Sequence, residues 1–160
     1  MDIGAGSGTD TVELLRRGWH VLAIDGDPHG IERLRKRAND DERLETHVGR
    51  FEDERWSDVD LVNASFALFF CTPQAFVAVW RRVVDSLRPG GRFAGHLLGD
   101  RDTWAANPDM NHHTRGVAER LLTGLEVELF EESEEPQGRT AVGDSKHWHS
   151  YHVVARKPAR

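Results

Sequence analysis

The sequence contains a single cysteine and lacks any long apolar stretch. With Cys71 as the one cysteine among 160 residues, the chain can form no internal disulfide, which favours a reducing compartment. The longest apolar run, 66–71, is too short to cross a bilayer, and no basic region followed by an apolar stretch opens the chain. We therefore expect a cytoplasmic protein with no membrane partner.

An excess of basic residues is also missing. The chain has 21 Lys and Arg residues against 27 Asp and Glu residues, which gives a formal net charge of -6. A nucleic-acid-binding surface would need a basic patch. The one basic cluster, 33–37, is flanked by acidic residues on both sides, which is typical of a solvated helix face. We expect no nucleic-acid partner.

Strand-like and helix-like patterns alternate along the chain. They predict a doubly wound α/β fold, in which a mostly parallel sheet carries helices on both faces. The expected strands are 1–3, 20–25, 44–48, 59–64, 92–98, 125–130 and 148–155, and the expected helices begin near 9, 28, 73 and 114. The last two strands should pair antiparallel, joined by an acidic, turn-rich segment at 131–145. At this length we expect one domain, 1–160.

The most specific feature is a glycine-rich turn at residues 2–10, Asp-Ile-Gly-Ala-Gly-Ser-Gly-Thr-Asp. Asp25 ends the next strand, about 20 residues beyond the first glycine, where doubly wound folds usually bind a ribose. The turn therefore points to an adenosine-containing ligand. Its glycines, at 4, 6 and 8, do not match the Gly-x-Gly-x-x-Gly of dinucleotide-binding proteins, and no P-loop lysine follows.

The Asp-x-Gly-x-Gly-x-Gly turn, the acid at the end of the second strand, and the turn Leu-Arg-Pro-Gly-Gly at 87–91 resemble the class I S-adenosylmethionine (SAM) dependent methyltransferases. The resemblance covers residues 2–157. It implies SAM as cofactor, methyl transfer as activity, and a seven-stranded sheet of order 3-2-1-4-5-7-6 whose last strand is antiparallel. Within the family, the small bacterial enzymes associated with tellurite resistance look closest.

The resemblance also implies roles for individual residues. The glycines would let the main chain pass under the cofactor, Asp25 would accept hydrogen bonds from both ribose hydroxyls, and Asp2 would orient the turn. Phe51 would lie against the adenine. The residues expected at the cofactor are Asp2, Gly4, Ala5, Gly6, Gly8, Asp25, Gly26, Phe51 and Asn63.

Two features depart from the family pattern. Arg50 stands where the family commonly has an acid that meets the adenine amino group, so Glu52 or Asp53 would have to replace it. The helical residues that usually precede the first strand and cover the cofactor are missing as well. Exposed apolar surface should result, and we expect that a homodimer could cover this region.

The acceptor should bind at the carboxyl ends of the fourth and fifth strands, beside the last strand pair. Candidates for the acceptor pocket are His96, Arg101, His147 and His149, and no catalytic residue stands out. The segment 63–66, Asn-Ala-Ser-Phe, is not the Asn-Pro-Pro-aromatic motif of DNA and protein methylases. Together with the acidic charge, this favours a small-molecule acceptor or an inorganic oxyanion.

The sequence allows three other interpretations. A metal site is not expected, because no cysteine or carboxylate completes a ligand spacing with the histidines. A catalytically impaired SAM-binding or dimeric regulatory module would keep the same fold without turnover. A nicotinamide-dependent oxidoreductase is disfavoured by the glycine spacing.

Overall fold

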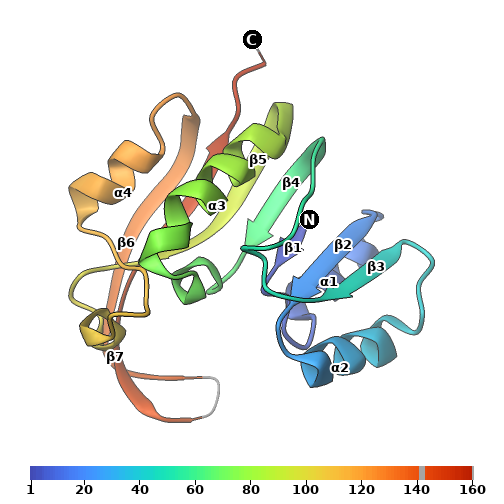
Figure 1. The fold of residues 1–160 in the computed structure, drawn as a ribbon, viewed down its shortest axis with the longest axis horizontal. Helices are drawn as coiled ribbons and strands as arrows, with labels where there is room; N and C mark the ends of the chain where they lie inside the picture. The colour runs from blue at the N-terminus through green and yellow to red at the C-terminus, as the bar shows by residue number, and fades with distance from the viewer. Residues whose placement is uncertain (141–142, 160) are drawn as a thin grey trace.

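A seven-stranded sheet organises the whole chain in the computed structural model, which describes residues 1–140 and 143–159 (Figure 1). The strand order is β3-β2-β1-β4-β5-β7-β6, as the family resemblance implied. The elements are β1 (Asp2–Ile3), α1 (Thr9–Arg16), β2 (Val21–Asp25), α2 (Pro28–Ala38), β3 (Leu44–Val48), β4 (Val59–Ala64), η1 (Leu68–Phe70), α3 (Pro73–Ser86), β5 (Leu87–Leu98), η2 (Thr103–Ala106), α4 (Arg115–Leu121), β6 (Glu126–Arg139) and β7 (Ser145–Arg156). Strand β7 runs antiparallel to both of its neighbours.

The order of strands places the helices on both faces of the sheet. Parallel strands are joined by right-handed crossovers. The chain moves from β1 toward one edge through α1 and α2, and from β4 toward the other edge through α3. The two sets of helices therefore cover opposite faces, and both β1 and β4 end at the point where the direction reverses. In doubly wound folds this switch point is where ligands bind.

Apolar side chains on one stripe of each helix build the core. Helix α3 buries Phe76, Trp80 and Val83 beneath the sheet half formed by β4, β5 and β7. On the other half, Ile31 and Leu34 of α2 belong to a separate cluster with α1 and β2. Helix α2 begins where the sequence predicts, because the Asp27 side chain accepts hydrogen bonds from two backbone amides of the first turn.

The acidic segment 131–145 was wrongly predicted as a turn. The structure continues β6 through Arg139 and begins β7 at Ser145, so most of this segment forms a long antiparallel hairpin (Figure 1). Alternation along β6 explains how a run of acids can form a strand. Glu132 and Glu134 lie on one face, where Arg101, in the loop after β5, pairs with both and offsets their repulsion.

The beginning of β5 also differs from the prediction of a turn followed by a strand at 92. Strand β5 starts at Leu87, directly after α3, and its register against β4 shifts between Val59 and Leu61. Gly90 adopts a left-handed φ of 84° within this irregular stretch, which a glycine tolerates without steric cost. In the described part of the chain, no helix is long and apolar enough to span a membrane.

Candidate functional site

The glycine-rich turn and Asp25 form one hydrogen-bonded unit at the end of β1 and β2. The backbone amide of Gly6 donates to Oδ2 of Asp25 at 2.7 Å, and the amide of Asp27 donates to Oδ1 at 2.7 Å. Both carboxylate oxygens keep further lone pairs for other donors. Asp25 is half-buried, so its carboxylate is fixed in orientation while remaining accessible.

The three glycines of the turn are needed for different reasons. Gly4, Gly6 and Gly8 all adopt left-handed φ values, of 68°, 54° and 83°. A Cβ at position 4 would lie 2.4 Å from the Cβ of Ala67, and one at position 8 would lie 2.2 Å from Cδ1 of Leu34. A Cβ at position 6 would meet nothing within 4 Å. At positions 4 and 8 the protein's own packing therefore requires glycine, and only position 6 faces open space.

Asp2 lies beneath the turn rather than in an open cavity. It is buried, and its carboxylate accepts hydrogen bonds from the Thr11 hydroxyl and from Nδ2 of Asn63, the latter at 2.9 Å. The same Asn63 amide donates to Oδ2 of Asp10 at 3.1 Å. Burial raises the pKa of Asp2 above its ordinary value. The structure thus brings Asp2 and Asn63 together as a link between β1, β4 and α1.

A cavity of about 280 Å³ opens beside Asp25. Four of the residues predicted at the cofactor line it: Gly4, Asp25, Gly26 and Phe51. The others, Asp2, Ala5, Gly6, Gly8 and Asn63, lie in the turn or beneath it. Phe66, Ala67 and Phe70, from the loop after β4 and from η1, close the opposite side.

The departure at Arg50 has a structural counterpart. Nη2 of Arg50 pairs with Oε1 of Glu52 at 2.5 Å, and both residues line the 280 Å³ cavity. Hydrogen bonding to Glu52 raises the pKa of Arg50. Nη1 of Arg82 holds this loop by donating to the backbone oxygens of Phe51, at 3.0 Å, and Glu52, at 3.1 Å. Of the two predicted replacements, Glu52 lines the cavity and is paired with Arg50, whereas Asp53 is exposed.

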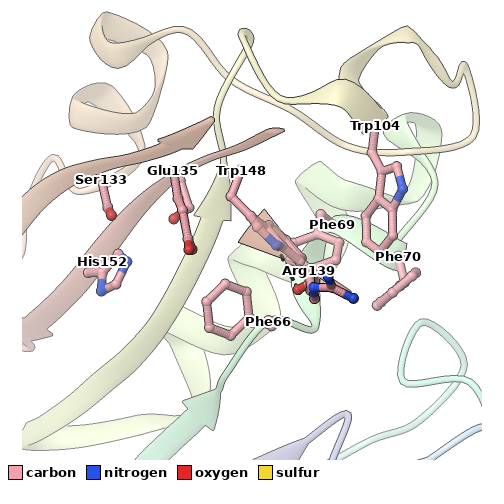
Figure 2. Close-up of a pocket in the computed structure, with 10 residues that line it drawn as sticks. Phe66, Phe69, Phe70, Trp104, Ser133, Glu135, Arg139, Trp148 and His152 are labelled. Carbon is pink, nitrogen blue, oxygen red and sulfur yellow. Dashed lines mark hydrogen bonds between the residues drawn. The ribbon is translucent and has the colours of Figure 1, made fainter. Parts of the chain in front are cut away.

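A second cavity, of about 480 Å³, adjoins the first and is shown in Figure 2. Phe66 and Phe70 line both cavities. The walls of the second cavity come from η1 and the loop before it, from η2, and from one face of the β6–β7 hairpin. Its lining residues are Phe66, Phe69, Phe70, Trp104, Ser133, Glu135, Arg139, Trp148, Ser150 and His152.

Five aromatic rings dominate the second cavity and contact one another. Trp148 lies edge-on to both Phe66, with centroids 5.4 Å apart, and Trp104, also 5.4 Å apart. Phe69 lies 5.8 Å from Trp104 at a tilt of 59°. Edge-to-face contacts of this kind are favourable and hold each ring in place. The aromatic wall is therefore largely pre-formed.

A buried lysine supports two of these rings. Nζ of Lys146 lies 4.4 Å from the ring centroid of Trp104 and 3.9 Å from that of Trp148, and it is paired with Asp102. The side chains of Lys146 and Asp102 are 1% and 0% exposed. Burial lowers the pKa of Lys146, although the bond to Asp102 opposes this. The ion pair connects η2 to β7 and fixes the separation of the two indoles.

The four residues predicted for the acceptor pocket lie in two places. His96 stacks on Phe66, with ring centroids 3.9 Å apart and an interplanar angle of 15°. His149 is fully buried, with Nε2 2.9 Å from Oε1 of Glu132 and Nδ1 accepting from the Arg101 amide at 3.1 Å. His147 lies 2.9 Å from Glu134. None of the four residues therefore lines the aromatic cavity: His96 lies against Phe66, and Arg101, His147 and His149 lie with the acids of β6.

Sequence reasoning named His147 and His149 as pocket candidates but missed Trp148, which lines the cavity. Neighbouring residues of a strand point to opposite faces. Trp148 and Ser150 line the cavity, so His147 and His149 point to the other face. The alternation of side chains along a strand would have separated Trp148 and Ser150 from His147 and His149. This required recognising the preceding acidic segment as the partner strand.

Comparisons with known proteins agree with this geometry. Residues 1–91 match the family model described as a methyltransferase domain. Methyltransferase nsrG of Aspergillus novofumigatus is 30% identical over 179 residues, which cover 98% of this chain and 69% of that protein. Among solved structures, TehB from Haemophilus influenzae superposes with a TM-score of 0.81 at 14% identity, over 98% of this chain and 56% of that one.

A further solved structure contains ligands. The Burkholderia thailandensis 1,6-didemethyltoxoflavin-N1-methyltransferase, with bound 1,6-didemethyltoxoflavin and S-adenosylhomocysteine, superposes with a TM-score of 0.72 at 22% identity. The match covers 98% of this chain and 69% of that chain. At such identities the likeness to the solved structures concerns the fold.

Proposed function

The chain belongs to the class I SAM-dependent methyltransferase family, and from this premise we propose that it methylates a small organic molecule held in the aromatic cavity. The observation that carries the proposal is the junction of the two cavities at Phe66 and Phe70. One cavity contains the carboxylate expected to bind a ribose, and the other is mostly apolar. Methyl transfer requires such neighbouring sites, because the acceptor must approach the methyl group in line with the breaking bond.

SAM would occupy the smaller cavity. Asp25 is held by the amides of Gly6 and Asp27, which leaves its oxygens oriented for two ribose hydroxyls. Phe51 and Glu52, on the loop after β3, are placed to contact the adenine. The open space at Gly6 would accommodate the part of the cofactor that crosses the turn. SAM carries no phosphate, so this turn acts by close approach of the main chain.

The aromatic cavity favours an organic acceptor over an inorganic oxyanion. An oxyanion needs several donors to replace its lost water, whereas the larger cavity presents mainly rings. Arg139, which lines this cavity, is exposed, and Lys146 is already paired with Asp102. One structurally similar methyltransferase is named for an organic molecule, 1,6-didemethyltoxoflavin, which supports an organic acceptor here.

Titration calorimetry with S-adenosylhomocysteine (SAH) and NAD tests the cofactor half of the proposal. We expect SAH to bind and NAD not to bind. Asp25→Asn should weaken SAH binding by about 1–3 kcal/mol, because the ribose loses a charged acceptor. Asp85→Asn is the matched control, since Asp85 is an exposed acid on α3. Equal affinities for the two variants would refute the ribose assignment.

The alternative of an impaired SAM-binding module predicts SAH binding without turnover of any acceptor. Methyl transfer to any organic acceptor, detected by SAH formation, would exclude it. A homodimer stays a prediction from the sequence. Val127, at 51%, and Leu129, at 44%, are exposed on β6, the edge strand, and not at the region before β1 that the predicted dimer would cover. Light scattering of the purified protein would decide between monomer and dimer.

A further inference from the structure

A row of three titratable side chains crosses the sheet next to the aromatic cavity. His96 on β5 lies directly opposite His152 on β7, and His152 lies directly opposite Glu131 on β6. Residues directly opposite in adjacent strands share one face of the sheet and are close enough to interact. The two imidazole centroids are 4.5 Å apart, nearly perpendicular at 81°. No step of the proposed function uses this row.

His96 is fixed in the uncharged form. Its Nδ1 accepts a hydrogen bond from the backbone amide of Phe66 at 3.2 Å, which leaves the proton on Nε2. Its ring stacks on Phe66. Burial, together with the neighbouring His152, lowers the pKa of His96 to about 4, against the opposing effect of Asp10. His96 therefore supports Phe66 and does not exchange protons at neutral pH.

His152 is placed differently. It is half-buried and lines the aromatic cavity, and Figure 2 shows it beside Phe66, on the side away from Phe70 and Trp104. Among the described residues its ring makes no hydrogen bond within the protein. An imidazole with free ring nitrogens in the wall of the aromatic cavity can accept a proton from a bound molecule.

The remaining walls of the cavity define what that molecule looks like. Rings of Phe66, Trp104 and Trp148 meet edge-to-face or at a tilt and enclose about 480 Å³, a volume typical of sites for drug-sized ligands. Flat aromatic surfaces bind well between such rings. Ser133 and Ser150, which face each other across the hairpin, add polar groups to this wall.

We propose that the acceptor is an aromatic compound with a hydroxyl group on its ring, and that His152 accepts the hydroxyl proton during methyl transfer. The inference rests on the proposed function and deepens it, because it names the class of acceptor and a catalytic residue. A thiolate or another soft anion would need no proton acceptor. An imidazole in the wall of the aromatic cavity, beside Phe66, is explained by an acceptor atom that carries a proton.

Methyl transfer to the hydroxyl is a nucleophilic substitution at the methyl carbon. The hydroxyl oxygen forms a bond to the methyl carbon while the bond from that carbon to sulfur breaks, and the electron pair of the broken bond stays on sulfur. The products are the aryl methyl ether and SAH. The hydroxyl proton passes to a ring nitrogen of His152 and from there to solvent. The groups facing His152 are His96 on β5 and Glu131 on β6, with Asp10 of α1 close to His96.

The test uses 4-nitrophenol, whose phenol and phenolate forms have different absorption spectra. Wild-type protein saturated with SAH is titrated with the probe at a pH where the free probe is protonated. We expect saturable binding and an increase in the phenolate band. A neighbouring imidazolium should lower the pKa of the bound probe by about 1–3 units, which is about tenfold in the phenolate-to-phenol ratio for each unit.

His152→Asn should still bind the probe but lose the added phenolate band, and His152→Gln serves as a second variant should the first fail to fold. The matched control is His20→Asn, since His20 is exposed and precedes β2 at the far end of that strand. His20→Asn should behave as the wild type. SAH affinity, measured by calorimetry, should be the same in all of these proteins.

Each contrary outcome has a distinct meaning. Absence of saturable probe binding to SAH-loaded wild type would overturn the aromatic acceptor while leaving the SAM site intact. Probe binding with equal phenolate bands in wild type and in the His152 variants would overturn the role of His152. Failure of wild-type protein to bind SAH would overturn the proposed function itself. Methylation of tellurite without probe binding would favour the oxyanion alternative.

Discussion

Replacing three glycines one at a time by alanine separates backbone strain, packing and cofactor binding. Gly6, Gly8 and Gly18 all adopt left-handed φ values, of 54°, 83° and 89°. An alanine costs about 1–2 kcal/mol in this conformation wherever it stands. Gly18→Ala measures this strain alone, because nothing lies within 4 Å of the added Cβ and the residue follows α1, away from the cavities.

Gly8→Ala should be clearly more destabilising than Gly18→Ala. The new Cβ would lie 2.2 Å from Cδ1 and 3.0 Å from Cγ of Leu34, whose side chain is fully buried. Overpacking of a core adds about 1–3 kcal/mol, so the free energy of unfolding should fall by about 2–5 kcal/mol in total. Gly6→Ala should lose no more stability than Gly18→Ala, because its Cβ enters open space.

Cofactor affinity should follow a different order. The space above Gly6 is where we place SAM, so Gly6→Ala should weaken SAH binding at least about tenfold, or about 1.4 kcal/mol. Gly18→Ala should bind SAH as the wild type does. Urea unfolding gives the stabilities, and calorimetric titration gives the affinities. The reasoning would be refuted if Gly8→Ala were as stable as Gly18→Ala, or if Gly6→Ala bound SAH normally.

Two more predictions concern buried titratable side chains. Lys146→Met leaves the Asp102 carboxylate buried without its charged partner, so the free energy of unfolding should fall by about 3–5 kcal/mol. The control is Lys36→Met, which removes an exposed ion pair and should change the free energy of unfolding by at most about 1 kcal/mol. Urea unfolding measures both variants. Burial lowers the pKa of His113 to about 4, so its neutral form stabilises the fold above its unfolded pKa of 6.5, and this stability is lost as the pH falls toward 4. A shift of this size corresponds to about 3 kcal/mol. His113→Gln should therefore flatten the acid side of the stability profile, and an unchanged slope between these pH values would contradict the assignment.

Local signals in the sequence were sufficient for most strands and helices, and the family resemblance supplied the strand order. The glycine spacing of the turn, the acid at the end of β2 and the proline at the start of α3 can each be read from a few consecutive residues. The boundaries of the long hairpin were missed for an equally physical reason. A run such as 131–135 looks solvated until its partners, including Arg101, are brought across from another part of the chain.

The aromatic cavity could not have been predicted from local pattern. Phe66, Trp104 and Trp148 come from three separate segments, and only the fold brings them together. Trp104 owes its position to the ion pair between Lys146 and Asp102, which crosses from η2 to β7. His152 was not among the predicted pocket residues, because nothing in its neighbours in the chain places it beside a cavity. The residue roles at the cofactor likewise stay predictions until a ligand is bound.

A crystal structure of the SAH complex tests the central claim most directly. We expect both ribose hydroxyls within hydrogen-bond distance of the Asp25 carboxylate, the adenine against Phe51, and the sulfur pointing toward Phe66 at the entrance to the aromatic cavity. A ribose placed away from the end of β2, or a sulfur directed away from that cavity, would contradict the account.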